Sequence, residues 1–160
     1  MLQRLTGSAI CALLVLTGSS CDDPASPYVP ADVPGRIRVD FSTQPGHWHA
    51  DQLTIDSASI VKDVLHVNVR HGGGCARHEY AAVAWNGWLE SSPVQVDAFV
   101  AHDANNDNCD ALLLARLRFD LRPLRDAYQK AYGQGPAELI IRLAEAFPWN
   151  HGPVMLRYRF

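Results

Sequence analysis

Hydrophobic and polar residues alternate along most of the chain beyond residue 36, with the two-residue period of half-buried strands. The clearest run is 111–121, where every second residue from Leu113 to Leu121 is apolar and the charged residues Arg116, Arg118 and Asp120 alternate with them from Ala115 on. The same alternation predicts further strands at residues 37–41, 53–60, 65–70, 80–85, 94–100, 139–143 and 154–160. Clusters of Gly, Pro, Asn and Asp separate these runs, so we expect about eight strands joined by turns.

One segment, residues 122–133, breaks the alternation and has the pattern of a short helix. Pro123 opens it, Leu124 and Tyr128 begin an apolar stripe at helical spacing, and Gly133 stands where a C-terminal cap belongs. Many strands with one helix indicate a mainly β domain. We expect a two-sheet antiparallel β-sandwich of immunoglobulin-like type.

Residues 1–20 have the composition of a secretory signal peptide. Arg4 precedes a short apolar stretch, and the small residues Gly18, Ser19 and Ser20 come just before Cys21. The apolar part is too short to span a bilayer comfortably. We expect cleavage before Cys21 and lipid attachment to its thiol, as in bacterial lipoproteins, although a lipobox has Leu, Val or Ile at the place of Gly18. Cleavage and secretion without a lipid is the alternative.

Residues 21–35 predict an extended tether, because four prolines fall within them and apolar periodicity is nearly absent. Residues 36–160 are enough for one domain with a hydrophobic core. The protein is therefore expected outside the cytoplasm, held by a lipid anchor on the periplasmic or cell-surface side of a bacterial membrane. Its formal net charge of −3 does not favour nucleic-acid binding, which needs a basic face.

Two of the four cysteines are predicted to form a disulfide. Cys11 lies within the signal peptide and Cys21 at its cleavage site, which leaves Cys75 and Cys109 as an isolated pair in an exported protein. The compartment outside the cytoplasm favours their oxidation.

The histidines are predicted to gather at one end of the sandwich. If consecutive strands run in opposite directions, the connections alternate between the two ends, which places Cys75 and Cys109 at the same end, as their disulfide requires. The same counting brings further residues there: His47, Trp48, His49, His71, His78, His102, Asp103, Asp107, Trp149 and His151. Histidines favour loops, so a structural or incidental role for them is the alternative. We take Trp48, Trp149 and His151 as candidate binding-surface residues.

A metal site is the sharpest chemical hypothesis for that end. The disulfide would bring the loops of His78 and His102 together, with Asp103 beside them, and His47 and His49 form a His-x-His pair whose side chains would share a face. Imidazole and carboxylate donors suit zinc or copper. A zinc site that used the thiolates of Cys75 and Cys109 would need both cysteines reduced.

Two other motifs suggest chemistry less strongly. Residues 103–110 begin with the D-x-N-x-D spacing of a calcium loop but have Asn108 at the glycine position and Leu114 at the place of the last carboxylate, so a looser calcium site or an Asn/Asp turn is expected there. Residues 71–74, H-G-G-G, echo an esterase oxyanion loop, but the chain has no G-x-S-x-G. We expect these glycines to provide positive φ angles in a turn, and we expect no enzyme activity.

The motifs G-G-G-C-x-x-H-x-Y at residues 72–80 and H-D-x-N-x-D-x-C at residues 102–109, behind a lipoprotein-like signal, resemble those of the small NigD-like group of exported bacterial lipoproteins. The resemblance covers roughly residues 65–121. It implies a surface-anchored β-sandwich and no established reaction. The sequence thus predicts a non-enzymatic binding or accessory module of the cell envelope, which contacts a protein or a glycan through the loop end of Cys75, His78, His102 and Asp103. The alternative is a lipoprotein that binds zinc or copper; no other cofactor is expected.

Overall fold

The structure is a computed structural model that describes residues 31–42, 45–146 and 152–160. Within these residues the chain forms nine strands and one α-helix. The strands are β1 (Ala31–Arg36), β2 (Arg38–Val39), β3 (Thr54–Val61), β4 (Val64–Gly73), β5 (Glu79–Leu89), β6 (Val94–Asp103), β7 (Ala111–Asp120), β8 (Glu138–Glu145) and β9 (Val154–Arg159). The α-helix, α1, is Arg122–Tyr132, and a 3₁₀ turn, η1, is Pro45–His47. The signal peptide, Cys21, Trp149 and His151 fall outside the described residues.

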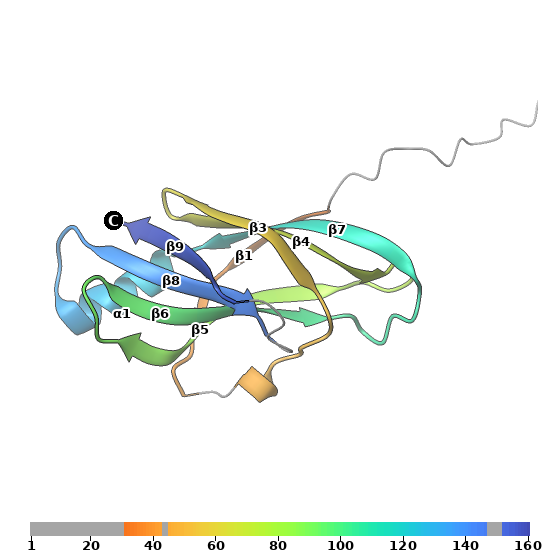
Figure 1. Cartoon of the computed structure of the whole chain (residues 1–160), viewed down its shortest axis with the longest axis horizontal. Coiled ribbons are helices and arrows are strands. Elements are labelled where there is room, and N and C mark those ends of the chain that lie inside the picture. The colour runs from red at the N-terminus through yellow and green to blue at the C-terminus, as the bar shows by residue number, and fades with distance from the viewer. Residues whose placement is uncertain (1–30, 43–44, 147–151) are drawn as a thin grey trace, which may run out of the picture.

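The strands form two sheets that face one another (Figure 1). One sheet has the order β1-β7-β4-β3 and the other the order β2-β5-β6-β8-β9. Their inner faces share one hydrophobic core, in which Leu65 and Leu117 of the first sheet and Val96 and Leu143 of the second are fully buried. Each such side chain contributes about 1.5–3 kcal/mol through its removal from water. The predicted mainly β, two-sheet sandwich is confirmed.

The pairing within the sheets is mixed, whereas an antiparallel arrangement throughout was expected. Strands β1 and β7, β2 and β5, and β6 and β8 pair in parallel. The β6–β8 pair arises because β7 belongs to the other sheet. The chain crosses over through β7 and α1 before it returns beside β6, and a parallel pair needs a crossover connection of this kind.

The first described strand begins at Ala31, within the segment that the sequence predicted as a tether to Gly35. Residues 31–36 form the edge strand β1, paired in register from Ala31 with Ala115 to Arg36 with Asp120. Pro34 is compatible with this place, because an edge strand can leave one side of its backbone without ladder hydrogen bonds. Residues 31–35 of the predicted tether thus lie in a strand of the first sheet.

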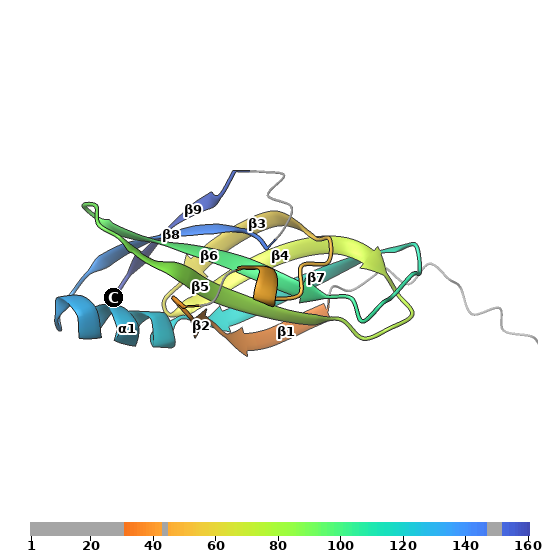
Figure 2. The same ribbon diagram turned by 90° about the horizontal axis from the view of Figure 1, so that it is seen from below.

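Helix α1 matches its prediction closely. A proline lies in its first turn, Leu124 is fully buried, and the backbone N–H of Gly133 caps the last turn by donating to the carbonyl of Gln129. The helix lies at one end of the sandwich, while the β4–β5 and β6–β7 connections lie at the opposite end (Figure 2). In the described part of the chain, no helix has the length and apolar character needed to cross a membrane.

Candidate metal centre

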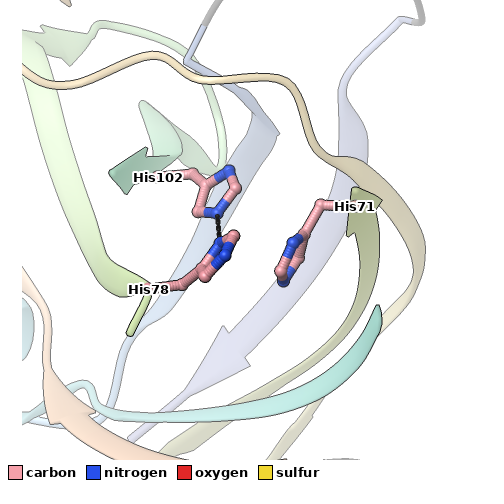
Figure 3. A group of neighbouring side chains, drawn as sticks. All are labelled: His71, His78 and His102. Atoms are coloured by element: carbon pink, nitrogen blue, oxygen red, sulfur yellow. Dashed lines mark hydrogen bonds between the residues drawn. The ribbon is translucent and has the colours of Figure 1, made fainter. Parts of the chain in front are cut away.

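Three histidines from both sheets meet between the sheets, at the end opposite α1 (Figure 3). His71 continues the inward row of Val67 and Val69 on β4, and His102 continues the inward row of Val100 on β6. Only 5% of His71 and 1% of His102 are exposed. His78 lies just before β5 in the β4–β5 connection, and its ring turns inward to meet the other two.

The three rings lie within van der Waals reach of one another. Ring centroids are 4.5 Å apart for His71 and His78, 4.4 Å for His71 and His102, and 5.0 Å for His78 and His102. One possible ligand atom from each ring lies within 4.8 Å of those of the other two. A single ion could therefore reach all three imidazoles after small shifts of the side chains.

An acceptor outside the cluster faces one nitrogen of each ring. The Nδ1 atom of His71 is 2.8 Å from the carbonyl oxygen of Gly72, Nδ1 of His102 is 3.3 Å from that of Asp51, and Nε2 of His78 is 3.1 Å from Oδ2 of Asp107. Ligating histidines in metal sites have such outer partners, which fix the tautomer by accepting the ring N–H. The nitrogens that remain, which we call the inner nitrogens, are Nε2 of His71, Nδ1 of His78 and Nε2 of His102.

Two of these inner nitrogens face one another, Nδ1 of His78 and Nε2 of His102, 2.8 Å apart (Figure 3). A neutral imidazole has one N–H and one lone pair, so this contact holds two lone pairs when both outer hydrogen bonds are made. If either ring took its other tautomer, the proton would lie at the contact between the two rings. A lone pair would then face the Asp107 carboxylate or the Asp51 carbonyl. A shared proton or a metal ion would resolve the contact without loss of either outer bond.

Burial disfavours an added proton shared between His78 and His102. It lowers the pKa of His102 to about 4, and the neighbouring His71 adds to this effect. Burial also lowers the pKa of His71, although the hydrogen bond to Gly72 opposes the shift. Neutral imidazoles at physiological pH are what a metal ion requires of its ligands.

Asp107 anchors the loop that carries His78. Its Oδ2 accepts hydrogen bonds from the backbone N–H groups of Gly74, Cys75 and Ala76 at 2.7–2.8 Å, and its Oδ1 accepts one from Cys109. These amide donors, with Cys109 and Ala76 foremost, hold the pKa of the Asp107 carboxyl well below its usual range. None of the side chain is exposed.

The predicted disulfide joins Cys75 to Cys109 and thus closes the same two loops a second time. The pair cannot supply thiolate ligands, which removes the alternative zinc site built on these cysteines. Both oxygens of Asp107 accept backbone N–H groups, which fits the Asn/Asp turn that was the alternative to a calcium site at these residues.

Gly73 and Gly74 have positive φ angles, of +134° and +122°, as the sequence predicted for this turn. A Cβ atom on Gly73 would lie 2.5 Å from Nε2 of His78 and 2.9 Å from Oδ2 of Asp107. The glycine therefore permits the backbone to approach the His78–Asp107 pair. One amide of this H-G-G-G segment, that of Gly74, does bind an anionic group together with the next two amides, but that group is the carboxylate of the protein's own Asp107.

Tyr80 completes the inner side of the cluster. Its hydroxyl lies 2.5 Å from Nε2 of His71, and its ring stacks on that of His102 with centroids 5.2 Å apart and planes 9° apart. A polar cleft of about 480 Å³ opens beside His102, with Asp51, Asp107 and Asp110 in its lining. The carboxylates of Asp51 and Asp110 give the cleft a negative character, which favours the approach of a cation.

The structure places the predicted site residues in two groups. His78 and His102 lie together, as predicted, whereas Asp103 lies with the exposed His49, whose Nε2 is 3.3 Å from its carboxylate. His47 is exposed in η1. Trp48 is half-buried, with its ring edge-on to Phe99 and beneath the guanidinium of Arg38.

His71 and Asp107, which the structure brings to the cluster, were predicted at this end but not as site residues. His71 had a signal in the sequence, because it follows Leu65, Val67 and Val69 in the apolar alternation and so must face inward. The role of Asp107 had no such signal, since its partners are backbone amides of a loop more than thirty residues away, at a separation of 31 for Ala76.

No protein-family model and no curated protein matches the chain. Among solved structures it is similar to a NigD-like immunity protein from Bacteroides caccae, with a TM-score of 0.52 and 17% identity over 78% of this chain and 58% of that one. It is also similar to a protein described as toxin-related from Parabacteroides distasonis, with a TM-score of 0.52 and 15% identity over 80% of this chain and 60% of that one. The chain thus spans about 60% of the length of these neighbours, and the likeness concerns the fold. At that level it agrees with the resemblance in the sequence.

Proposed function

We propose that this chain is an exported, lipid-anchored protein of the cell envelope whose sandwich domain binds a transition-metal ion, without enzyme activity, through His71, His78 and His102. The observation that carries the proposal is the convergence of three buried imidazoles from both sheets, each with an outer acceptor for its second ring nitrogen. Ligand sets of three histidines are well suited to zinc and copper.

The surroundings of the cluster support binding rather than a purely structural role. Burial keeps the imidazoles of His71 and His102 neutral, so protons compete weakly for them. When both outer hydrogen bonds are made, the contact between His78 and His102 holds two lone pairs and no proton. A bound cation would accept both lone pairs. The acidic cleft beside His102 provides a route for a cation from solvent.

The test is isothermal titration of the untagged full chain with zinc, copper and calcium, after alkylation of the thiols outside the disulfide. We expect one ion of zinc or copper per chain and no heat with calcium. His78→Ala should weaken binding by more than the 10- to 100-fold that loss of an outer partner costs. His66→Ala removes a histidine of β4 whose place in the strand alternates with the inward row, and it is the matched control. Absence of heat with both metals, or unchanged affinity in His78→Ala, rejects the proposal.

A second candidate function is contact with an envelope protein or a glycan. It is favoured by the descriptions of the two structural neighbours, one an immunity protein and one toxin-related. It is also favoured by a small cleft at this end that Arg38, Trp48, His49 and Asp103 help to line. Trp48→Ala should abolish recovery of such a partner with the chain from native membranes, while His78→Ala should not. If the partner is recovered with Trp48→Ala but not with His78→Ala, the contact does not use the cleft of Trp48.

The membrane anchor has a separate test. Cys21→Ser should move the protein from the membrane fraction to the soluble fraction of exported material. The wild-type chain should carry a lipid mass at Cys21. A membrane-bound Cys21→Ser variant, or an N-terminal peptide without a lipid, would contradict lipid anchoring.

A further inference from the structure

We infer that Tyr80 is a fourth ligand of the histidine cluster, and that the site takes divalent copper in a tetragonal arrangement of three imidazole nitrogens and one phenolate oxygen. This inference rests on the proposed metal-binding function. It goes further because it names the metal and adds a residue that the sequence did not single out for this role.

The position of Tyr80 carries the first step. Its hydroxyl oxygen lies 2.5 Å from Nε2 of His71, the ring nitrogen that remains when Nδ1 donates to Gly72. An ion bound to that nitrogen at about 2.0–2.1 Å must displace the phenolic proton, since both would use the same lone pair. The hydroxyl oxygen, which lies on the side of that lone pair, must then move aside to make room for the ion, and as a phenolate it can remain as one of the ion's ligands.

The ring of Tyr80 is already held in place. It stacks on His102 with a 9° angle between planes, and the two residues are cross-strand partners on β5 and β6. Because the side chain is half-buried and ordered by this contact, little rotamer freedom is lost on coordination. The phenol is therefore a preorganised donor that enters the cluster from the second sheet.

The distances between donor atoms favour right angles at the ion. Two ligands about 2.0–2.1 Å from one ion are about 2.9 Å apart at 90° and about 3.4 Å apart at the tetrahedral angle. The pair His78 Nδ1 and His102 Nε2 is separated by 2.8 Å, and the pair His71 Nε2 and Tyr80 oxygen by 2.5 Å. Both separations are hydrogen-bond contacts of the metal-free chain, and they would lengthen by about 0.1–0.4 Å to reach the right-angled edge but by about 0.6–0.9 Å to reach the tetrahedral one. A tetragonal set of nitrogen and oxygen donors is typical of copper(II), whereas structural zinc prefers a tetrahedron.

The chemistry balances without electron transfer. The Tyr80 O–H bond breaks, its proton goes to solvent, and the phenolate oxygen donates its electron pair to the ion. One phenolate and three neutral imidazoles leave a divalent ion with a net charge of +1. The Asp107 carboxylate, 3.1 Å from Nε2 of His78, lies on the far side of a ligand ring and offsets part of that charge.

The experiment compares the untagged full chain, alkylated outside its disulfide, with Tyr80→Phe and with the control Tyr132→Phe. Tyr132 also loses a hydroxyl hydrogen bond, to Glu90, but it lies on α1 at the opposite end. Copper(II) and zinc affinities, protons released on binding, the visible absorption spectrum and the electron paramagnetic resonance spectrum are measured for each.

We expect wild type and Tyr132→Phe to show an axial copper(II) resonance and a phenolate-to-copper charge-transfer absorption. Tyr80→Phe should lose that absorption, bind copper about 10- to 100-fold more weakly, and release about one proton fewer. Its zinc affinity should change less than about threefold, because zinc can complete three histidines with water. If wild type binds metal through the histidines but Tyr80→Phe keeps the absorption, the affinity and the proton count, the copper–tyrosinate inference is wrong and the proposed function stands. If wild type binds no metal, both are wrong.

Discussion

The Oδ2 atom of Asp107 lies 3.1 Å from Nε2 of His78 while it also accepts three backbone N–H groups from residues 74–76. One carboxylate oxygen thus holds both the ligand ring and the turn that precedes it. The conformation of the loop and the metal affinity of the site should therefore depend on the same carboxylate. Because Asp107 is not itself a proposed ligand, a substitution there tests this dependence while all proposed ligands remain.

Asp107→Asn should weaken metal binding by about 10- to 100-fold, because the amide has one oxygen acceptor where the carboxylate has two and no longer offers His78 a charged partner. The melting temperature of the metal-free chain should also fall, since at least one of the loop amides loses its acceptor. Titration calorimetry and thermal unfolding check both effects. Asp126→Asn, which changes an exposed carboxylate on α1 at the opposite end, is the control. Equal metal affinity in the two variants would show that Asp107 does not orient His78.

Gly73→Ala should destabilise the fold by about 1–3 kcal/mol, because alanine is strained at a φ of +134° and its Cβ would clash with the ring of His78. Gly72→Ala is a matched control one residue away, since its Cβ would meet nothing within 4 Å. It should change stability by no more than about 0.5 kcal/mol. Urea unfolding measures both, and equal costs for the two substitutions would contradict this account of the turn.

Removal of the Cys75–Cys109 disulfide should lower the free energy of unfolding by about 4 kcal/mol, because the bridge closes a loop with a sequence separation of 34 in the unfolded chain. The double substitution to Ser, compared with wild type in urea, tests this. Peptide mapping after alkylation without a reductant should find both cysteines unmodified. A modified Cys75 in the native protein would refute the bridge.

The metal-free chain should lose stability as the pH falls from 6.5 toward 4. His102 has its pKa lowered to about 4 by burial, so in this window the unfolded chain binds a proton at His102 that the folded chain does not. The groups that face it are His71, His78, Tyr80 and the carbonyl and carboxylate of Asp51. The Asp107 carboxyl stays ionised in this window, because its pKa is well below the usual range.

Urea midpoints at pH 7 and pH 4.5 measure the effect. The drop between the two pH values should be smaller in His102→Asn than in wild type, and unchanged in His66→Ala. A drop of the same size in all three proteins would assign the pH dependence to other groups.

Much of the fold could be predicted from the sequence because each strand buries one face. The alternation of Leu65, Val67 and Val69, and of the row on β7, fixed which residues face inward. Counting strand directions then brought Cys75 and Cys109 to one end, and this holds although some strands pair in parallel, because the count needs only the direction of each strand.

Strand neighbours and loop contacts were beyond such reasoning. Nothing local tells β8 to pair with β6 rather than with β7, because that choice depends on how the two sheets share the core. The same is true of Asp107, whose partners are backbone amides that carry no side-chain signal. His71 could have been included in the predicted site, since its inward position followed from the alternation, but the predicted ligands were chosen from the loops that the disulfide joins.

The most direct test of the central claim is an anomalous difference map, collected at the copper absorption edge, from crystals of the full chain loaded with one equivalent of copper(II). The account predicts a single strong peak between the sheets, about 2.0–2.1 Å from Nε2 of His71, Nδ1 of His78 and Nε2 of His102. A peak at the exposed His49–Asp103 pair instead, or no peak near these three nitrogens, would contradict it.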